Sequence, residues 1–217
     1  GSRDSITVII NPLPFKPTVV TPVKYCQNAI STPLQATASS GNTLLWYNAR
    51  TGGIGTSVAP LPSTIDTGIY IYYVSQKNIA TGCEGLRDSI IINVLALPTS
   101  PLVLSPVNYC VGANAVNLIA TPSTDCSLRW YPTITGGTPS TTPPKPATTI
   151  AGIQKYYVSQ VNNSSNCEGE RDSIVVDVRA LPLPPGVSTP VKYCLGANAS
   201  QLAANPTSGN TLRWYTV

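Results

Sequence analysis

The sequence repeats itself at a fixed interval, and this period constrains the fold more than any other feature. Three segments that begin at Tyr25, Tyr109 and Tyr193 align without gaps, at offsets of 109 − 25 = 84 and 193 − 109 = 84. They read YCQNAISTPLQATASSGNTLLWY, YCVGANAVNLIATPSTDCSLRWY and YCLGANASQLAANPTSGNTLRWY. A second motif, RDSI, begins at Arg3, Arg87 and Arg171. Such a period indicates a row of similar units that each form one structural module.

Proline-rich segments mark the boundaries between these units. They read NPLPFKP from residue 11, LALPTSP from residue 95 and RALPLPP from residue 179, and proline is typical of linkers because it fixes φ and lacks an N–H. We predict that residues 1–11 are the last strand of a preceding repeat. Residues 12–96 and 97–180 are then complete repeats, and residues 181–217 are the first part of a further one.

Alternation of apolar and polar residues predicts β-strands inside each repeat. Ile90, Ile92 and Val94 alternate with more polar neighbours, and Leu44 and Trp46 share one face of an earlier segment. This period of two indicates strands with one buried face. About seven short strands in each repeat, with a buried tryptophan, favour an all-β chain of tandem antiparallel β-sandwiches, and no helical period supports an α-helix.

The motifs of the repeat resemble those of a known family. The order YC, PLxATA, LxWY, TGG, YYVSQ and CEGxRDSIxVxV resembles the immunoglobulin-like repeat of giant secreted surface proteins of Bacteroidetes bacteria, which include gliding-motility adhesins. The resemblance covers the whole chain, but its motifs belong to the repeat family and not to one protein. It implies immunoglobulin-like domains arranged end to end in an extracellular filament that the type IX secretion system exports to the cell surface.

The composition disfavours several classes of function. The 13 basic residues are scattered through the chain, whereas nucleic-acid binding needs a basic stripe. No apolar run approaches the roughly 18 residues of a membrane span. Because the chain has no histidine, the usual nucleophile–base pairs cannot form, so we expect no enzyme, no catalytic residue and no cofactor. The nine acidic residues are mostly isolated, so we expect no metal site.

The only acidic pairs that recur with the repeat lie just before the last strand. They are Glu84 with Asp88 and Glu168 with Asp172, and each pair flanks an arginine. We interpret them as surface ion pairs or turn caps, because a structural unit that is repeated along a chain has no need of an active site in each copy.

Aromatic residues and serines supply the remaining candidates for binding and modification. Trp46 and Trp130 share a face with buried leucines and are interpreted as core, which leaves Tyr73 and Tyr157 as the more exposed candidates for a glycan platform. Three Asp-Ser-Ile tripeptides resemble the O-glycosylation acceptor of Bacteroidetes, and the residues concerned are Ser5, Ser89 and Ser173.

Four of the six cysteines recur with the repeat and are expected to form disulfides in an oxidising compartment. The separations 83 − 26 = 57 and 167 − 110 = 57 are equal, and they favour intradomain bonds Cys26–Cys83 and Cys110–Cys167. An interdomain bond Cys26–Cys167 stays open as the alternative, because the first turn and the last hairpin of a simple immunoglobulin topology lie at opposite ends.

Two further cysteines have no partner at that spacing. Cys126 stands where the other repeats have Asn42 and Asn210, and the partner of Cys194 would fall at 194 + 57 = 251, past the last residue at 217. We therefore expect Cys126 and Cys194 to be free thiols.

The hypothesis that fits these observations is a structural shaft or spacer in a long cell-surface adhesin, with gliding motility and surface attachment as its context. Its partners are neighbouring repeats of the same chain, and surface polysaccharide or the gliding machinery beyond them. The alternative is an accessory binding module of a secreted polysaccharide-degrading enzyme. For the part-repeats at the two ends, we expect that the chain is a window into a longer filament. The alternative is that residues 3–11 of one copy complete the open sheet formed by residues 187–217 of another.

Overall fold

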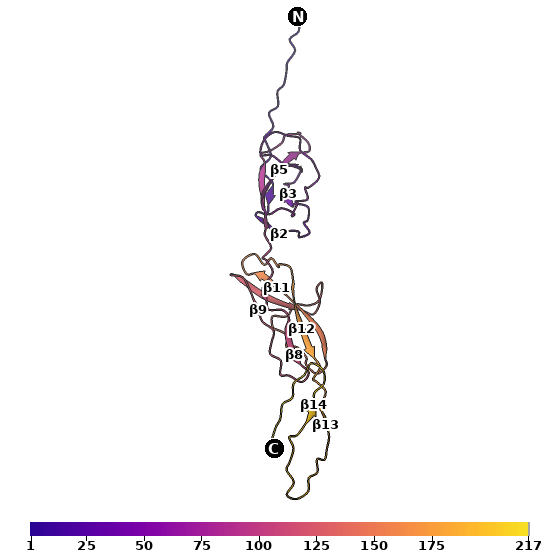
Figure 1. Cartoon of the computed structure of the whole chain (residues 1–217). Coiled ribbons are helices and arrows are strands. Elements are labelled where there is room, and N and C mark those ends of the chain that lie inside the picture. Colours follow the sequence, from indigo (N-terminus) through magenta and orange to yellow (C-terminus); the bar gives the residue numbers. More distant parts are fainter. Residues whose placement is uncertain (217) are drawn as a thin grey trace. The chain divides into compact units, whose positions relative to one another are not determined.

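The computed structural model describes residues 1–216, and its regular structure consists of β-strands alone (Figure 1). The first repeat contains β1 (Thr18–Val19), β2 (Val23–Cys26), β3 (Ala36–Thr37), β4 (Asn42–Tyr47), β5 (Gly68–Asn78) and β6 (Asp88–Leu95). The second contains β7 (Leu102–Val103), β8 (Val107–Cys110), β9 (Ala120–Thr121), β10 (Cys126–Tyr131), β11 (Gly152–Asn162) and β12 (Asp172–Arg179). Two short strands follow, β13 (Gly186–Val187) and β14 (Ala204–Asn205). The all-β fold expected from the sequence is confirmed.

Each complete repeat has a four-stranded sheet and a two-stranded sheet. The order is β2-β6-β5-β4 with β1-β3 in the first repeat, and β8-β12-β11-β10 with β7-β9 in the second. All neighbours are antiparallel except β2 with β6 and β8 with β12, which are parallel. The first strand therefore changes sheets within one repeat, and Pro22, which has no N–H to donate to a ladder, lies between its two halves.

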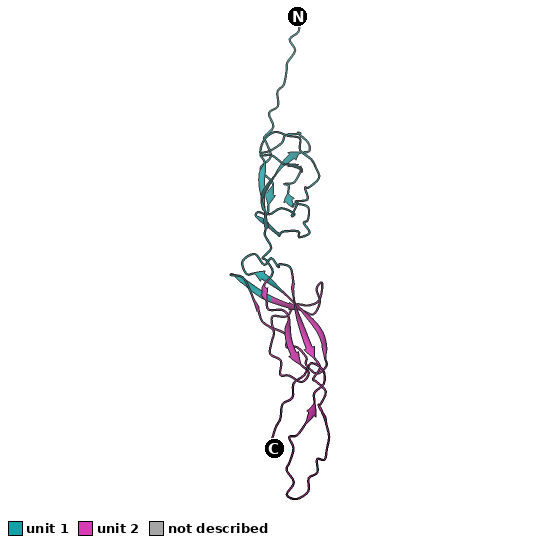
Figure 2. Cartoon of the chain, viewed as in Figure 1, with its two compact units in different colours: residues 1–100, 122–128, 159–170 teal, residues 101–121, 129–158, 171–217 magenta. Residues whose placement is uncertain are grey.

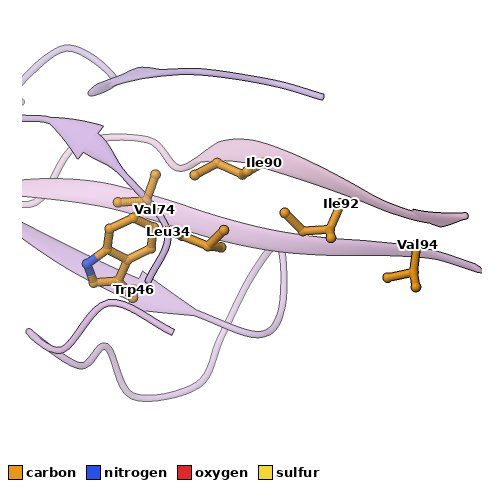
Figure 3. Close-up of a cluster of buried hydrophobic side chains, with 6 residues drawn as sticks. All are labelled: Leu34, Trp46, Val74, Ile90, Ile92 and Val94. Atoms are coloured by element: carbon orange, nitrogen blue, oxygen red, sulfur yellow. The ribbon is translucent and has the colours of Figure 1, made fainter. Parts of the chain in front are cut away.

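The core lies on the inner face of the four-stranded sheet, as the alternation of the sequence predicts. Ile90, Ile92 and Val94 of β6 are at most 3% exposed and pack with Trp46, Val74 and Leu34 (Figure 3). The matching residues of the second repeat are equally buried, and they are Leu118, Trp130, Val158, Ile174, Val176 and Val178. Burial of such apolar surface is the main stabilising contribution to a domain of this size.

The segment after β4 closes the outer edge of that sheet without forming a strand. The Trp46 N–H donates to the Thr56 carbonyl at 2.8 Å, and the Thr56 N–H donates to the Trp46 carbonyl at 3.0 Å. Trp130 and Ser140 exchange the same two bonds at 2.8 and 2.9 Å. The sequence predicts about seven strands in each repeat, but this long segment contributes only an isolated bridge, so each repeat has six.

The two ends of the chain differ in how much of a repeat they form. β13 pairs with β14 in the register of β1 with β3, so residues 186–205 reproduce the first two-stranded sheet of a repeat. Residues 1–11 form no strand, and Ile6, Val8 and Ile10 are 78–93% exposed. Their assignment to the last strand of a preceding repeat stays a prediction.

By its internal contacts the chain divides into two compact units (Figure 2). One unit comprises residues 1–100, 122–128 and 159–170, and the other comprises residues 101–121, 129–158 and 171–217. The first unit thus contains the first repeat together with the hairpin that joins β11 to β12.

The linker that enters each repeat lies directly against that repeat's last hairpin. A Cβ atom on Gly169 would approach the Pro98 carbonyl oxygen to 2.2 Å, and one on Gly85 would approach the Pro14 carbonyl oxygen to 2.2 Å. Only glycine allows this approach, because the atoms in the way belong to the backbone.

We expect Gly169→Ala to lower the free energy of unfolding by about 2 kcal/mol, because the linker backbone must move away from the new methyl group. Urea unfolding measures the change. Gly186→Ala is the matched control, since its Cβ would meet its nearest neighbour at 3.9 Å; a loss as large in the control would show that the clash is not the cause.

Candidate functional site

The disulfide of the structure crosses from one repeat to the next. Cys26, the last residue of β2, is bonded to Cys167 in the β11–β12 hairpin, with a Cα–Cα distance of 5.5 Å. The predicted intradomain bonds Cys26–Cys83 and Cys110–Cys167 are therefore wrong for this structure. The interdomain pairing that the sequence leaves open is the one observed.

The parallel pairing of β2 with β6 explains this outcome. Cys26 lies opposite Leu95, the last residue of β6, whereas Cys83 precedes Asp88, the first residue of β6. The eight residues of β6 span about 25 Å, and a disulfide needs Cα atoms within about 7 Å. Cys26 thus lies where the chain leaves its repeat, and Cys83 lies where the chain enters it.

Four cysteines are free thiols in the structure: Cys83, Cys110, Cys126 and Cys194. Cys126 begins β10 and is half-buried, and Cys194 is exposed. Cys83 and Cys110, which the sequence placed in disulfides, have no bonded partner among residues 1–216.

A fully buried glutamine ties the entering linker to the sheet in each repeat. The Gln160 side-chain Nε2 donates to the Thr99 carbonyl at 2.6 Å and to Ser123 Oγ at 2.9 Å, and its Oε1 accepts from the Ser123 N–H at 2.6 Å. Gln76 makes the same three bonds with Phe15 and Ser39. Because a buried amide is costly unless it is hydrogen-bonded, these contacts determine where the linker lies.

A polar cluster joins β4, β5 and the last hairpin of the first repeat. The carboxylate of Glu84 accepts hydrogen bonds from Tyr47 Oη at 2.5 Å and from Ser75 Oγ at 2.6 Å. The guanidinium of Arg87 lies 3.2 Å from the centroid of the Tyr47 ring and donates to the Ala49 carbonyl at 2.7 Å. The arginine thus combines a cation–π contact with a hydrogen bond.

The second repeat contains the same arrangement. Ser159 Oγ donates to Glu168 Oε1 at 2.6 Å, and the Arg171 guanidinium lies 3.3 Å from the Tyr131 ring centroid. Arg171 also donates to the carbonyls of Thr133 and Gly136. The two repeats thus share a cluster whose residues bind one another.

The environment of Glu84 favours its ionised form. Burial raises the pKa of this carboxyl, but hydrogen bonds from Ser75 and Tyr47, with the charges of Arg87 and Lys77, outweigh burial and leave the pKa below its usual value. The pKa of Tyr47 is raised, first by burial and then by its bond to Glu84.

We expect stability to fall in acid through Glu84. A carboxyl whose pKa is lowered by folding contributes stability above its unfolded pKa of about 4.3, and that contribution is lost as the pH falls through the folded pKa. Urea unfolding from pH 7 down to pH 3 measures the loss. Glu84→Gln should flatten this acid dependence, and the exposed Glu170→Gln, as control, should leave it unchanged; equal slopes in wild type and Glu84→Gln would contradict the assignment.

The two carboxylates of the first acidic pair have different partners, and Asp88 makes a surface ion pair of the kind that the sequence predicts. Asp88 lies 3.4 Å from the Lys16 ammonium and accepts a hydrogen bond from the Ser89 N–H, whereas Glu84 binds Tyr47 and Ser75. No group of three or more acidic or cysteine side chains able to hold a metal lies among residues 1–216.

Most of the tyrosines and serines that the sequence offers as candidates for binding or modification are half-buried. Tyr73 and Tyr157 are half-buried, like the tyrosines that precede them, so they are not the more exposed aromatic residues that the sequence predicts. Ser5 is exposed, whereas Ser89 in β6 and Ser173 in β12 are half-buried. No helix among the described residues is long and apolar enough to cross a bilayer.

Sequence reasoning missed the buried glutamine and the arginine–tyrosine contact. The signal was present, since the segment VSQ recurs at Val74 and Val158 and Arg87 recurs as Arg171. A polar residue that recurs beside a buried valine is evidence of a buried hydrogen bond, and the same repetition also identified the core.

Comparison with known proteins supports this architecture. A sequence model described as "Ig-like domain CHU_C associated" matches residues 14–95 and 98–179. Solved structures of similar fold include human mucin-like protocadherin EC1-2 (10% identity, 73% of this chain and 95% of that chain, TM-score 0.27). They also include the I67–I69 fragment of titin (17%, 76% and 64%, TM-score 0.29) and the Ig1-2 module of the Drosophila receptor tyrosine phosphatase DLAR (11%, 76% and 96%, TM-score 0.26).

With TM-scores below 0.3, these structural likenesses carry no argument, and no curated protein sequence matches the chain. The sequence model, in contrast, covers most of the chain with two consecutive matches that together leave only the two ends and a short linker unmatched. The chain belongs to the family of Ig-like domains described as CHU_C associated, and it carries two tandem copies of that domain.

Proposed function

We propose that these repeats form part of the shaft of a long cell-surface adhesin, which holds a binding tip away from the cell. The observation that carries the proposal is the Cys26–Cys167 disulfide. A bond between consecutive repeats limits how far their junction can bend. Limited bending is the property that a spacer needs.

The residues that the two repeats share support the same function. They form the core, the buried glutamine and the arginine–tyrosine contact, and all of these bind other residues of the chain. An outward position of β4, in contrast, changes from Leu45 to Arg129 in β10. The repeats thus keep their structure while their surface varies, as in an array whose units serve for length.

The resemblance of the motifs extends the proposal to its biological setting. We place the chain in a filament like the gliding-motility adhesin SprB, exported by type IX secretion and located outside the cell. A disulfide is consistent with that location, because such bonds persist in oxidising compartments. In this setting Ser5, Ser89 and Ser173 are proposed O-glycosylation sites.

The alternative, an accessory polysaccharide-binding module, finds little support in the two complete repeats. A glycan platform needs exposed aromatic rings, but every tyrosine and tryptophan between residues 16 and 180 is buried or half-buried. Phe15, which is 89% exposed, stands alone in the linker before β1.

The spread of distances between the two repeats tests the shaft. Fluorophores on non-natural residues at Ser57 and Thr141, which occupy equivalent exposed positions, report that spread by single-molecule energy transfer. We expect a narrow distribution in the oxidised protein and a broad one in Cys26→Ser and in Cys167→Ser. An equally narrow distribution in both variants would contradict a role of the disulfide in spacing.

A binding experiment separates the two candidate functions. The oxidised chain is incubated with cellulose, chitin, xylan and alginate, and the bound fraction is measured. A spacer should bind none of them at micromolar concentration. Saturable binding that is lost on substitution of Tyr73 and Tyr157 would favour the accessory module.

A further inference from the structure

We infer that Cys83 and Cys110 are the unpaired halves of two more inter-repeat disulfides, so that wherever the sequence period continues, each junction carries the bond seen between Cys26 and Cys167. The observed bond joins residues 141 apart, which equals 57 + 84. The same rule places the partner of Cys110 at 110 + 141 = 251, and that of Cys83 at 83 − 141 = −58, the position equivalent to Cys26 in a preceding repeat. This inference rests on the repeat symmetry of the structure and not on the proposed shaft.

The surroundings of Cys110 match those of Cys26 bond for bond. Cys26 lies opposite Leu95 and Cys110 lies opposite Arg179 in equivalent parallel ladders. The residue after each cysteine bonds to that opposite residue. The Gln27 N–H donates to the Leu95 carbonyl, and the Val111 N–H donates to the Arg179 carbonyl, both at 2.8 Å. The Cys26 carbonyl accepts a bond from the N–H three residues on at 3.1 Å, and the Cys110 carbonyl accepts the equivalent bond at 3.0 Å. Cys110 therefore occupies the position from which Cys26 reaches the following repeat.

The hairpin that carries Cys83 is equivalent to the one that carries Cys167. The Cys83 carbonyl accepts from the Asn78 N–H at 2.9 Å, and the Cys167 carbonyl accepts from the Asn162 N–H at 3.0 Å. The cysteine N–H bonds to a hydroxyl two residues earlier in both hairpins, at 3.3 and 3.2 Å. The two residues that precede the cysteine differ between the hairpins. Thr81 and Gly82 stand where the second repeat has Ser165 and Asn166, yet the cysteine is present in both.

The fold provides these thiols with no partner inside their own repeat. Cys110 and Cys167 are separated by the length of β12, eight residues, or about 25 Å. Cys126 has no cysteine at the equivalent position of either other copy. An adjoining repeat is the partner that the observed bond already demonstrates.

The inferred bonds change the covalent structure of an array. Each junction would be crossed twice, once by the backbone linker and once by a disulfide that begins at the cysteine ending β2 or β8. The disulfides of successive junctions overlap in sequence, since the segment from Cys26 to Cys167 contains Cys110. No junction could then open completely without breaking a covalent bond.

The chemistry requires a two-electron acceptor. Two thiols lose two protons and two electrons as the S–S bond forms, and a small-molecule or protein disulfide accepts them and is reduced to two thiols. Glutathione disulfide serves this purpose in the test below.

The test adds a complete repeat after the one that contains Cys110. A chain is built from residues 1–180 followed by residues 97–217, so that the second repeat occurs twice and the whole original chain is retained. Cys126→Asn in both copies removes the unrelated thiol, and Ser164→Thr in the added copy marks its Cys167 peptide by mass. The protein is refolded with glutathione disulfide, alkylated and digested without reduction.

We expect two linked pairs: Cys26 with Cys167 of the original copy, and Cys110 of the original copy with Cys167 of the added copy. Alkylation of the original Cys110 should fall at least tenfold relative to the 217-residue chain. The Cys26 bond reports independently that the chain has folded. If that bond forms while the original Cys110 stays alkylated, the inference is overturned. A bond between Cys110 and Cys167 of its own copy, formed in place of the Cys26 bond, would overturn it as well.

A single variant provides the matched control. Cys110→Ser in the original copy should leave the Cys26 bond intact and make Cys167 of the added copy alkylatable. The distances between repeats, which test the shaft, are measured on the chain without the added copy, so that either proposal can fail without the other.

Discussion

Stretching a single molecule between its two termini should release about 490 Å more chain after reduction than before it. The disulfide bypasses the 141 residues between Cys26 and Cys167, and an extended chain spans about 3.5 Å per residue. In the oxidised protein the applied force passes through residues 1–26, across the bond and on through residues 167–217. Nearly all of the first repeat's core, including β5 and β6, then bears no load.

Optical tweezers measure this difference as contour length, with handles attached beyond both ends. The oxidised chain should extend only to the contour of the two segments outside the disulfide loop, and addition of a reductant should expose the remainder. Cys26→Ser should behave like the reduced protein without reductant. A full-length extension of the oxidised wild-type protein would contradict the bond.

Gln160→Leu should destabilise the second repeat by about 4 kcal/mol. Leucine fits the space but leaves the Thr99 carbonyl and the Ser123 N–H without the partners they have at 2.6 Å, and each unpaired group costs about 1–3 kcal/mol. Hydrogen exchange followed by mass spectrometry should show faster exchange in β11 and β12.

The equivalent glutamine of the first repeat provides a control for this substitution. Gln76→Leu should speed exchange in β5 and β6 while the second repeat keeps its protection, and the exposed Gln201→Leu should change neither. Unchanged exchange in Gln160→Leu would show that the linker is held by other contacts.

Strands with one buried face could be predicted from the sequence. Burial of one face imposes an alternation of apolar and polar residues, and both complete repeats display it. Ile90, Ile92 and Val94 illustrate this, and so does Trp46, whose partner Leu44 lies on the same face. The segment between β4 and β5 could not be predicted, since its prolines and glycines mark irregular chain without saying whether a strand lies among them.

The disulfide partner of Cys26 could not be predicted, because it depends on the direction in which β2 pairs. A strand of four residues, VKYC, has too few positions to show whether it lies parallel or antiparallel to its neighbour. That direction decides which end of the repeat Cys26 occupies, and equal spacing of cysteines is compatible with both answers. The recurring VSQ segment indicates a buried glutamine, but the partners of Gln76 could not be predicted, because they are atoms of Phe15 and Ser39, which lie far from it in sequence.

The bridge between Trp46 and Thr56 has a consequence for molecules that crowd together. Side chains and N–H groups alternate along β4, so Asn42, Leu44 and Trp46 direct their backbone groups away from β5. The Asn42 N–H bonds to the Ser39 carbonyl at 3.1 Å, and Trp46 exchanges two hydrogen bonds with Thr56, so the outward N–H groups of two of these three residues are already paired. Strand addition needs a row of unpaired backbone groups. The edge that β4 presents is therefore a poor site for strand addition by a neighbouring molecule.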